Sequence, residues 1–172
     1  SLSQADYVSN DILLIGKFQG TRATGALLQN DVPVFRTADI YLAMAEALAS
    51  RNQLLGSSNN IDDLIGDLTS VQGILTTIRF NRTKVGETVV VPTITTVQSA
   101  WKAILDERRI ELAFEGQRYL DMKRIGAKAG SNGFERYSKD CIVNAACNLP
   151  VNSFKMTLPI PTTELNSNPI IR

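Results

Sequence analysis

The stretch ERRIELAFEGQRYLDMKR, Glu107–Arg124, places apolar residues at helical spacing within a dense run of charges. Leu112 and Tyr119 continue a seven-residue spacing that begins at Leu105, so all three residues share one face of a helix. Gly116 interrupts this pattern, because glycine is a poor helix former. The stretch therefore predicts one helix that ends before Gly116 and a second, short helix that follows it.

The charged residues of this stretch have the spacing of ion pairs on a helix. Glu107, Glu111 and Glu115 recur every four residues and so share one helix face. Grouped carboxylates are one route to a metal site or to an acid–base pair, but neighbouring arginines compete with a cation for them. We therefore expect a structural ladder of ion pairs. The arginines that we expect to take part are Arg108, Arg109, Arg118 and Arg124, with Arg36 or Arg79 as the partner of Glu46.

Two further helices, and the start of the helix that ends before Gly116, are predicted from apolar spacing and capping residues. Thr37–Arg51 is rich in alanine, which favours helix formation and close packing. A second stripe, with apolar residues alternately four and three positions apart, predicts a continuous helix over Ile61–Phe80. Thr95 followed by Gln98 has the pattern of a capping box, which predicts the start of a third helix. The predicted apolar faces comprise Ala38, Tyr41, Leu42, Ala45 and Leu48 in the first helix, and Val97, Trp101, Ile104 or Leu105, Arg108 and Leu112 in the third.

The last third of the chain is predicted to be mostly irregular. Residues 126–153 are rich in Gly, Ser and Asn, which predicts a long loop with short structure. Phe154–Pro161 is predicted to be extended, because its prolines exclude a helix interior. Cys141 and Cys147 form either a local disulfide or two free thiols, and a disulfide requires that their Cα atoms lie within about 7 Å. The sequence leaves both alternatives open.

The composition excludes several classes of function. With 44% hydrophobic and 20% charged residues, the 172-residue chain predicts a single folded domain over residues 1–172. Its net charge of +1 predicts no nucleic-acid partner. The chain contains no histidine, which removes the commonest general base and most catalytic zinc sites. It also lacks the glycine motifs that hold phosphate groups, so we predict no enzymatic activity, no cofactor and no metal.

Four segments, in this order, resemble the SusD/RagB family of glycan-binding lipoproteins in the outer membrane of Bacteroidetes-type bacteria. VPVFRTADIYLAMAEALA (Val32–Ala49) is similar to a family helix, and ILTTIRFNRTKVG (Ile74–Gly86) to the segment that ends in Arg-x-Arg-Ala-Gly. The charged stretch Glu107–Arg124 is similar to the family signature. LPIPTTELNSNP (Leu158–Pro169) resembles the closing motif. The resemblance covers roughly residues 31–170.

The resemblance implies a mainly α fold, a SusD-like scaffold with tetratricopeptide-like helix packing, long loops and little β structure. It implies non-catalytic capture of oligosaccharide at the bacterial cell surface and delivery to a SusC-like TonB-dependent transporter. It further implies an outer-membrane location through a lipid anchor that is not present in this chain. Family members carry a long amino-terminal half, so we expect this chain to be the carboxy-terminal part of a larger protein. It would then bind the missing half or self-associate.

Two other functional interpretations remain open at this stage. One is a helical protein–protein interaction module, in which an exposed groove binds a partner segment instead of a sugar. The other is a glycoside hydrolase, which requires two carboxylates about 5–10 Å apart. We favour neither, because the carboxylates of the chain are surrounded by arginines and the four segments point to the glycan-binding family.

Sugar sites usually combine an aromatic ring with amide and carboxylate groups. Phe134 and Tyr137 lie in the Gly- and Asn-rich region, so we predict that these two residues bind ligand at the surface. Trp101, Phe114 and Tyr119 lie on predicted amphipathic helices and are expected in the core.

Overall fold

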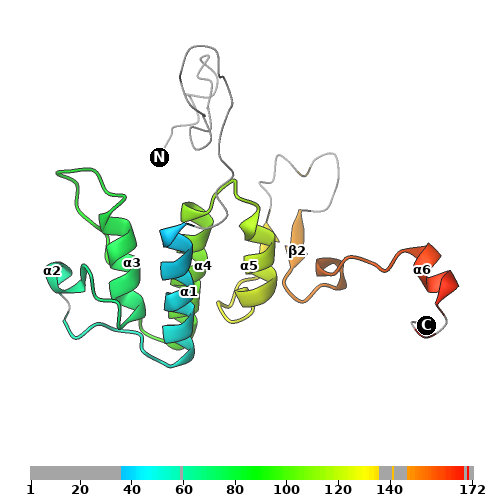
Figure 1. Ribbon diagram of the computed structural model, residues 1–172, viewed down its shortest axis with the longest axis horizontal. Helices are drawn as coiled ribbons and strands as arrows, with labels where there is room; N and C mark the ends of the chain where they lie inside the picture. The colour runs from blue at the N-terminus through cyan, green and yellow to red at the C-terminus, as the bar shows by residue number, and fades with distance from the viewer. Residues whose placement is uncertain (1–35, 59, 136–140, 142–146, 169, 171–172) are drawn as a thin grey trace, which may run out of the picture. The chain divides into compact units, whose positions relative to one another are not determined.

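The computed structural model describes residues 36–58, 60–135, 141, 147–168 and 170 (Figure 1). The chain divides into two units, Ser1–Arg36 and Thr37–Arg172, and the described helices and strands belong to the second. That residues 1–172 form one domain stays a prediction. The described residues form six α-helices, one 3₁₀ helix and one two-stranded sheet. Their bounds are α1 Thr37–Ser50, α2 Ile61–Leu64, α3 Val71–Phe80, α4 Val97–Glu111, α5 Gln117–Ile125, β1 Gly133–Glu135, β2 Asn148–Pro150, η3 Phe154–Met156 and α6 Thr162–Ser167.

Four helices, α1, α3, α4 and α5, build the core. Helix α1 packs against both α3 and α4, and α4 packs against α5, so the four helices stand side by side (Figure 1). The predicted apolar face of α1 is confirmed, since Leu42 and Ala45 are fully buried and Tyr41 and Leu48 pack against the core. Of the described residues 51% are helical, and these residues contain only two short strands, so the fold is mainly α, as predicted. Its tetratricopeptide-like packing stays a prediction.

The prediction of one continuous helix over Ile61–Phe80 is wrong. Helix α2 ends at Leu64, and Gly66 then adopts a φ of +86°, which breaks the helix. Asp67 stabilises the turn, because its carboxylate accepts hydrogen bonds from the hydroxyls of Thr69 and Ser70 at 2.6 Å each. The apolar spacing continued through this break, which is why periodicity alone did not reveal it.

Helix α3 begins directly after the turn that Asp67 stabilises. The Ser70 hydroxyl caps α3 by accepting a hydrogen bond from the Gly73 backbone N–H at 2.9 Å. A Cβ at Gly73 would collide with the backbone oxygen and side chain of Asp67. Glycine at this position therefore lets the turn lie directly on the helix.

The capping box of α4 lies one residue later than predicted. Thr96 is the N-cap, and its hydroxyl accepts from the Ser99 backbone N–H at 3.0 Å, while the Ser99 hydroxyl accepts from the Thr96 N–H at 2.9 Å. Gln98 is not the reciprocal partner, because Ser99 occupies the third helical position. The predicted buried face is confirmed from Trp101 to Leu112, whereas Val97 is 41% exposed in the first turn.

The second short helix after Gly116 is confirmed as α5, and Gly116 has the φ of +76° that favours glycine. Strands β1 and β2 pair antiparallel, with Phe134 opposite Leu149. The segment Phe154–Pro161 is not extended throughout, since η3 forms its first turn under a Ser153 cap. Its prolines lie beyond that turn, where a 3₁₀ helix does not conflict with them.

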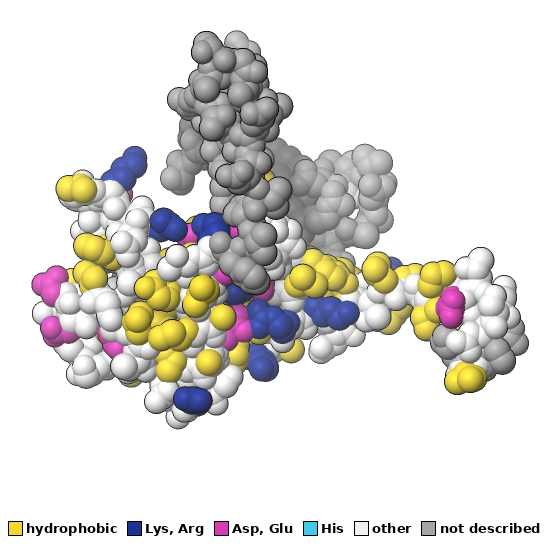
Figure 2. Space-filling model, viewed as in Figure 1, with side chains coloured by type: hydrophobic (Ala, Val, Ile, Leu, Met, Phe, Trp, Pro, Cys, Tyr) yellow, Lys and Arg dark blue, Asp and Glu magenta, His cyan; other side chains and the backbone are white. Residues whose placement is uncertain are grey.

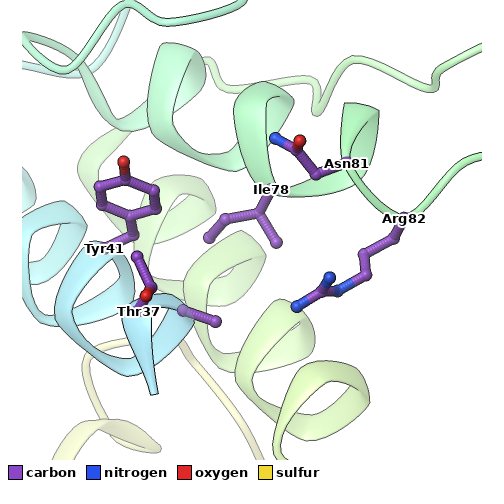
Figure 3. Close-up of a pocket in the computed structure, with 6 residues that line it drawn as sticks. Thr37, Tyr41, Ile78, Asn81 and Arg82 are labelled. Atoms are coloured by element: carbon purple, nitrogen blue, oxygen red, sulfur yellow. The ribbon is translucent and has the colours of Figure 1, made fainter.

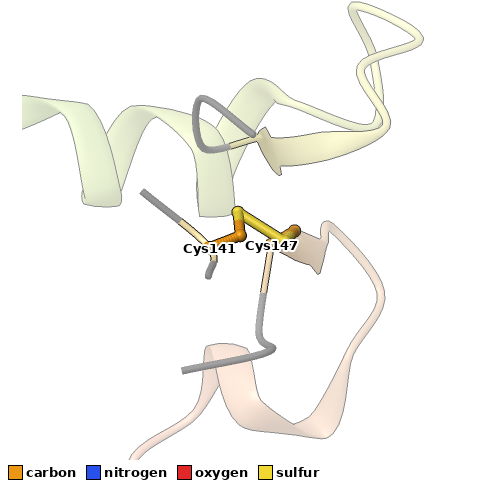
Figure 4. The surroundings of a disulfide bond; sticks show 2 residues. All are labelled: Cys141 and Cys147. Carbon is orange, nitrogen blue, oxygen red and sulfur yellow. A yellow bond between two sulfur atoms is a disulfide. The ribbon is translucent and has the colours of Figure 1, made fainter. Parts of the chain in front are cut away.

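Cys141 and Cys147 form a disulfide, with their Cα atoms 5.3 Å apart (Figure 4). Cys141 is buried, and Cys147 directly precedes strand β2. Of the two alternatives that the sequence left open, the structure therefore has the bonded one. The bridge therefore joins Cys141 to the residue directly before β2.

Candidate functional site

Phe134 lies in strand β1 and belongs to a packed pair of rings. Its ring stacks on that of Tyr119 in α5, with the centroids 6.2 Å apart and the planes 9° apart. The Tyr119 hydroxyl donates a hydrogen bond to the Met156 backbone oxygen, which fixes the ring in place. Tyr137 lies outside the described residues. That Phe134 and Tyr137 bind ligand stays a prediction, but one face of the Phe134 ring is turned toward Tyr119.

The aromatic residues expected in the core are not all buried. Trp101 is buried, and Lys128 Nζ lies over its ring, 4.6 Å from the ring centroid. Phe114 is 70% exposed and Tyr119 38% exposed, so the prediction was wrong for Phe114 and partly wrong for Tyr119. Helix α4 ends at Glu111, which places Phe114 in the turn beyond the helix and off the apolar stripe.

A pocket of about 400 Å³ opens between the start of α1 and the end of α3 (Figure 3). Its size falls within the range of small-molecule sites in proteins. In Figure 3, Thr37 and Tyr41 lie on one side, Asn81 and Arg82 on the other, and Ile78 between them. The described residues that line the pocket are Thr37, Ala38, Tyr41, Ile78, Asn81 and Arg82.

Local helix geometry places the polar groups of this pocket. Thr37 and Tyr41 are one turn apart on α1, so both side chains face the same way. Asn81 is the C-cap of α3, and its Nδ2 donates to the Thr77 backbone oxygen at 2.8 Å. This hydrogen bond fixes the Asn81 amide at the pocket edge. The pocket thus combines an aromatic ring, a hydroxyl, an amide and a guanidinium around an apolar floor.

Arg82 is held by a carboxylate of the neighbouring helix. Its Nε and Nη2 donate to the two carboxylate oxygens of Glu111 at 3.0 and 2.7 Å. The Glu111 side chain is 8% exposed, whereas that of Arg82 is 57% exposed. The hydrogen bonds from Arg82 to Glu111 and the charge of Glu111 raise the pKa of the guanidinium above its ordinary value. Arg82 is therefore a fixed, permanently charged donor at the pocket wall.

The chain matches the model of the SusD family over residues 8–172. It belongs to the SusD family. SusD family proteins bind glycans, generally without catalysis, and generally work with SusC-like transporters. They are typically found at the outer-membrane surface. Comparison with curated proteins and with solved structures gives no match.

Both sides of the pocket come from segments that resemble SusD family motifs. Thr37 and Tyr41 lie within Val32–Ala49, and Asn81 and Arg82 lie within Ile74–Gly86. Sequence reasoning missed all four as site residues, and it assigned Tyr41 to the apolar face of a helix. The signal that could have found the pocket was the polar pair that directly follows the last apolar residues of α3.

The ion pairs of the charged stretch connect helices and do not form a ladder along one helix. Glu107 pairs with Arg79 of α3, and Glu111 pairs with Arg82, which lies just beyond the end of α3. Both glutamates lie on the buried face of α4. The structural role is retained, but the predicted partners are wrong. In the part of the chain that the structure describes, no group of three or more acidic, Cys or His side chains is placed to hold a metal.

Glu46 pairs with arginines other than the two that we expected. Its carboxylate lies 3.6 Å from Arg108 Nη1 and accepts hydrogen bonds from Arg124, where Arg36 or Arg79 was predicted. Asp121 completes this cluster, with its Oδ1 2.8 Å from Arg108 Nε. The cluster joins α1, α4 and α5, so its partners come together only when the helices pack.

None of the helices described here is both long and apolar enough to cross a membrane.

Proposed function

We propose that this chain captures oligosaccharide at the bacterial outer-membrane surface and passes it to a SusC-like TonB-dependent transporter. The observation that carries the proposal is the SusD family match over residues 8–172. The pocket between α1 and α3 is the part of the described structure that best fits this role. A lipid anchor that holds the protein at the outer membrane belongs to the same proposal.

The chemistry of the pocket supports saccharide binding. A sugar ring presents apolar C–H faces and a rim of hydroxyls. Tyr41 offers an aromatic surface for the C–H faces. Hydrogen-bonding groups for the hydroxyls come from Thr37, Asn81 and Arg82. Ile78 and Ala38 supply an apolar floor. Few polar groups around an apolar surface are typical of small-molecule sites.

The proposed role is non-catalytic. A glycoside hydrolase needs a pair of carboxylates available for proton transfer or nucleophilic attack. The pocket wall holds Glu111 in two hydrogen bonds to Arg82, and Glu107 is paired with Arg79 at 2.7 Å. Both carboxylates are therefore held in ion pairs with arginine and do not form the open pair that a glycoside hydrolase uses.

A binding experiment with the full chain tests the proposal. Calorimetry with neutral hexasaccharides of α-glucan, β-glucan, β-mannan and β-xylan should give at least one saturable interaction. Tyr41→Leu keeps an apolar side chain but removes the ring, and it should weaken that interaction about ten-fold, equivalent to roughly 1.4 kcal/mol. Phe114→Leu is the matched control, because Phe114 is 70% exposed and does not line the pocket. An equal loss in both variants would count against the pocket.

The rival function is a helical protein–protein interaction module without sugar binding. The observation in its favour is the apolar surface that follows β2 (Figure 2), where Phe154 is 84% and Leu158 is 85% exposed. Exposed apolar patches often mark protein interfaces. Light scattering over a dilution series distinguishes the two. Self-association without any saccharide binding would favour the interaction module, and saccharide binding by a monomer would favour capture.

A further inference from the structure

The charges at the pocket wall affect which kind of saccharide the pocket can bind. Among the described residues that line the pocket, Arg82 is the one with a charged side chain. Its charge is offset by Glu111, which engages Nε and Nη2 and leaves Nη1 as the guanidinium nitrogen that this carboxylate does not hold. The wall therefore presents a donor group within a neutral ion pair.

A second ion pair, one turn away, can be compared with the pair formed by Arg82 and Glu111. Arg79 Nε donates to Glu107 Oε2 at 2.7 Å, and its Nη1 donates to the Val90 backbone oxygen at 2.9 Å. Both pairs join α3, or the residues just after it, to α4, and both glutamates are buried. Arg82 lines the pocket, whereas neither Arg79 nor Glu107 does. The two pairs thus share a structural role but differ in their access to a ligand.

We propose that Glu111 is a positioning residue that neutralises Arg82 and so makes the pocket select neutral saccharides over acidic ones. This inference rests on the proposed capture of oligosaccharide. A sugar hydroxyl needs a well-placed donor, and Arg82, held on two sides by Glu111, supplies one without the entropy cost of ordering a loose side chain. Glu111 acts through Arg82 and does not itself line the pocket.

An uncompensated arginine would favour the opposite class of ligand. A guanidinium binds a carboxylate strongly, in a two-pronged arrangement that uses adjacent nitrogens. In this pocket Glu111 already occupies such a pair of nitrogens, and its negative charge repels the carboxylate of a uronic acid. Selectivity of this kind comes from a repulsive element as much as from an attractive one.

The test compares Glu111→Gln with Glu107→Gln in the full chain. Each variant removes one buried negative charge from an α3–α4 pair and keeps the size of the side chain. Both are titrated with two sets of hexasaccharides: the neutral panel above, and galacturonan and guluronan as acidic probes. We expect the ratio of neutral to acidic affinity to fall about ten-fold in Glu111→Gln, a change of about 1.4 kcal/mol, and to be unchanged in Glu107→Gln.

Three other outcomes overturn the inference. The first is an equal shift of the ratio in both variants, and the second is no shift in Glu111→Gln. In the third, the wild-type chain prefers acidic probes. Arg82→Gln is the second variant if Glu111→Gln does not fold, since the Arg82 side chain is 57% exposed. It should weaken neutral binding without strengthening acidic binding, and unchanged neutral binding would overturn the inference.

The design separates this inference from the function on which it rests. If the wild-type chain binds neither panel, the proposed capture of oligosaccharide fails. If it binds neutral sugars and Glu111→Gln alters only the melting temperature, capture stands and the role assigned to Glu111 fails.

Discussion

The four-helix core and the segment that follows strand β2 use similar apolar residues with opposite results. In the core, Leu42, Ile74 and Ile104 are completely buried. Beyond η3, Leu158 is 85% and Ile160 is 46% exposed. The difference lies in what surrounds each residue. Core leucines and isoleucines recur at helical spacing and face other helices, whereas Leu158 and Ile160 alternate with prolines, which exclude a helix interior.

The core also contains paired charged side chains. Three helices contribute to an ion cluster in which Arg108 and Asp121 are buried, Glu46 is partly buried and Arg124 lies at the exposed edge. Burial of charge is costly unless each group is paired, and here each arginine meets two carboxylates. The cluster therefore makes the helix arrangement specific: a shift of α5 relative to α1 would leave buried charge without a partner.

The largest loss of stability is expected from Arg108→Ala, which disrupts the ion cluster of the core. It leaves Asp121, which is 2% exposed, without its closest cation and should destabilise the chain by about 3–5 kcal/mol. Arg109→Ala is the matched control, since Arg109 is the exposed neighbour on the same helix. Thermal unfolding followed by circular dichroism measures both. Similar melting temperatures for the two variants would mean that the buried cluster contributes little.

A smaller effect is expected from Gly73→Ala. The new methyl group collides with the backbone of Asp67, which cannot move without opening the turn before α3, and the cost should be about 1–3 kcal/mol. Gly66→Ala is an informative comparison, because no atom lies within 4 Å of its would-be Cβ and only the φ of +86° opposes it. Urea unfolding gives both values. A stabilised Gly73→Ala variant would show that the contact yields at little cost.

The Asp67 turn should also make stability depend on pH. Burial raises the pKa of Asp67, but hydrogen bonds from Ser70 and Thr69 outweigh it, so the pKa lies below the ordinary value of 3.8. A carboxylate with a lowered pKa stabilises the fold above its unfolded pKa, and this contribution is lost as the pH falls through the folded pKa. The melting temperature should therefore decline below about pH 3.8. Asp67→Asn should flatten that part of the profile, and an unchanged slope would exclude the turn as its source.

The smallest effect is expected outside the core. Leu158→Ala removes an exposed side chain and should change the free energy of unfolding by no more than about 0.5 kcal/mol. Leu42→Ala is its counterpart within the core and should cost about 2–5 kcal/mol. Chemical unfolding of both variants sharpens the contrast between the two regions. A large loss in Leu158→Ala would indicate that this residue packs against a partner in solution.

Several features of this protein were predictable from local sequence. The spacing of Leu42 and Ala45 predicted the buried face of α1, and Gly116 predicted the boundary between α4 and α5. Both predictions depend on residues within one or two turns, where helix periodicity and glycine conformation act directly. The break at Gly66 was missed, because apolar periodicity continued through it and masked the turn chemistry of Asp67 and Ser70.

The sequence by itself determined that the chain is mainly helical, that it resembles the SusD family and that its dense charges form ion pairs. Only the tertiary structure decided which charges meet and where a pocket forms. Glu107 and Glu111 pair with Arg79 and Arg82, which lie 28 and 29 residues away, because α3 and α4 pack side by side. The physical reason is range: periodicity and capping act within a few residues, whereas ion pairs and pockets depend on which helix faces are brought into contact.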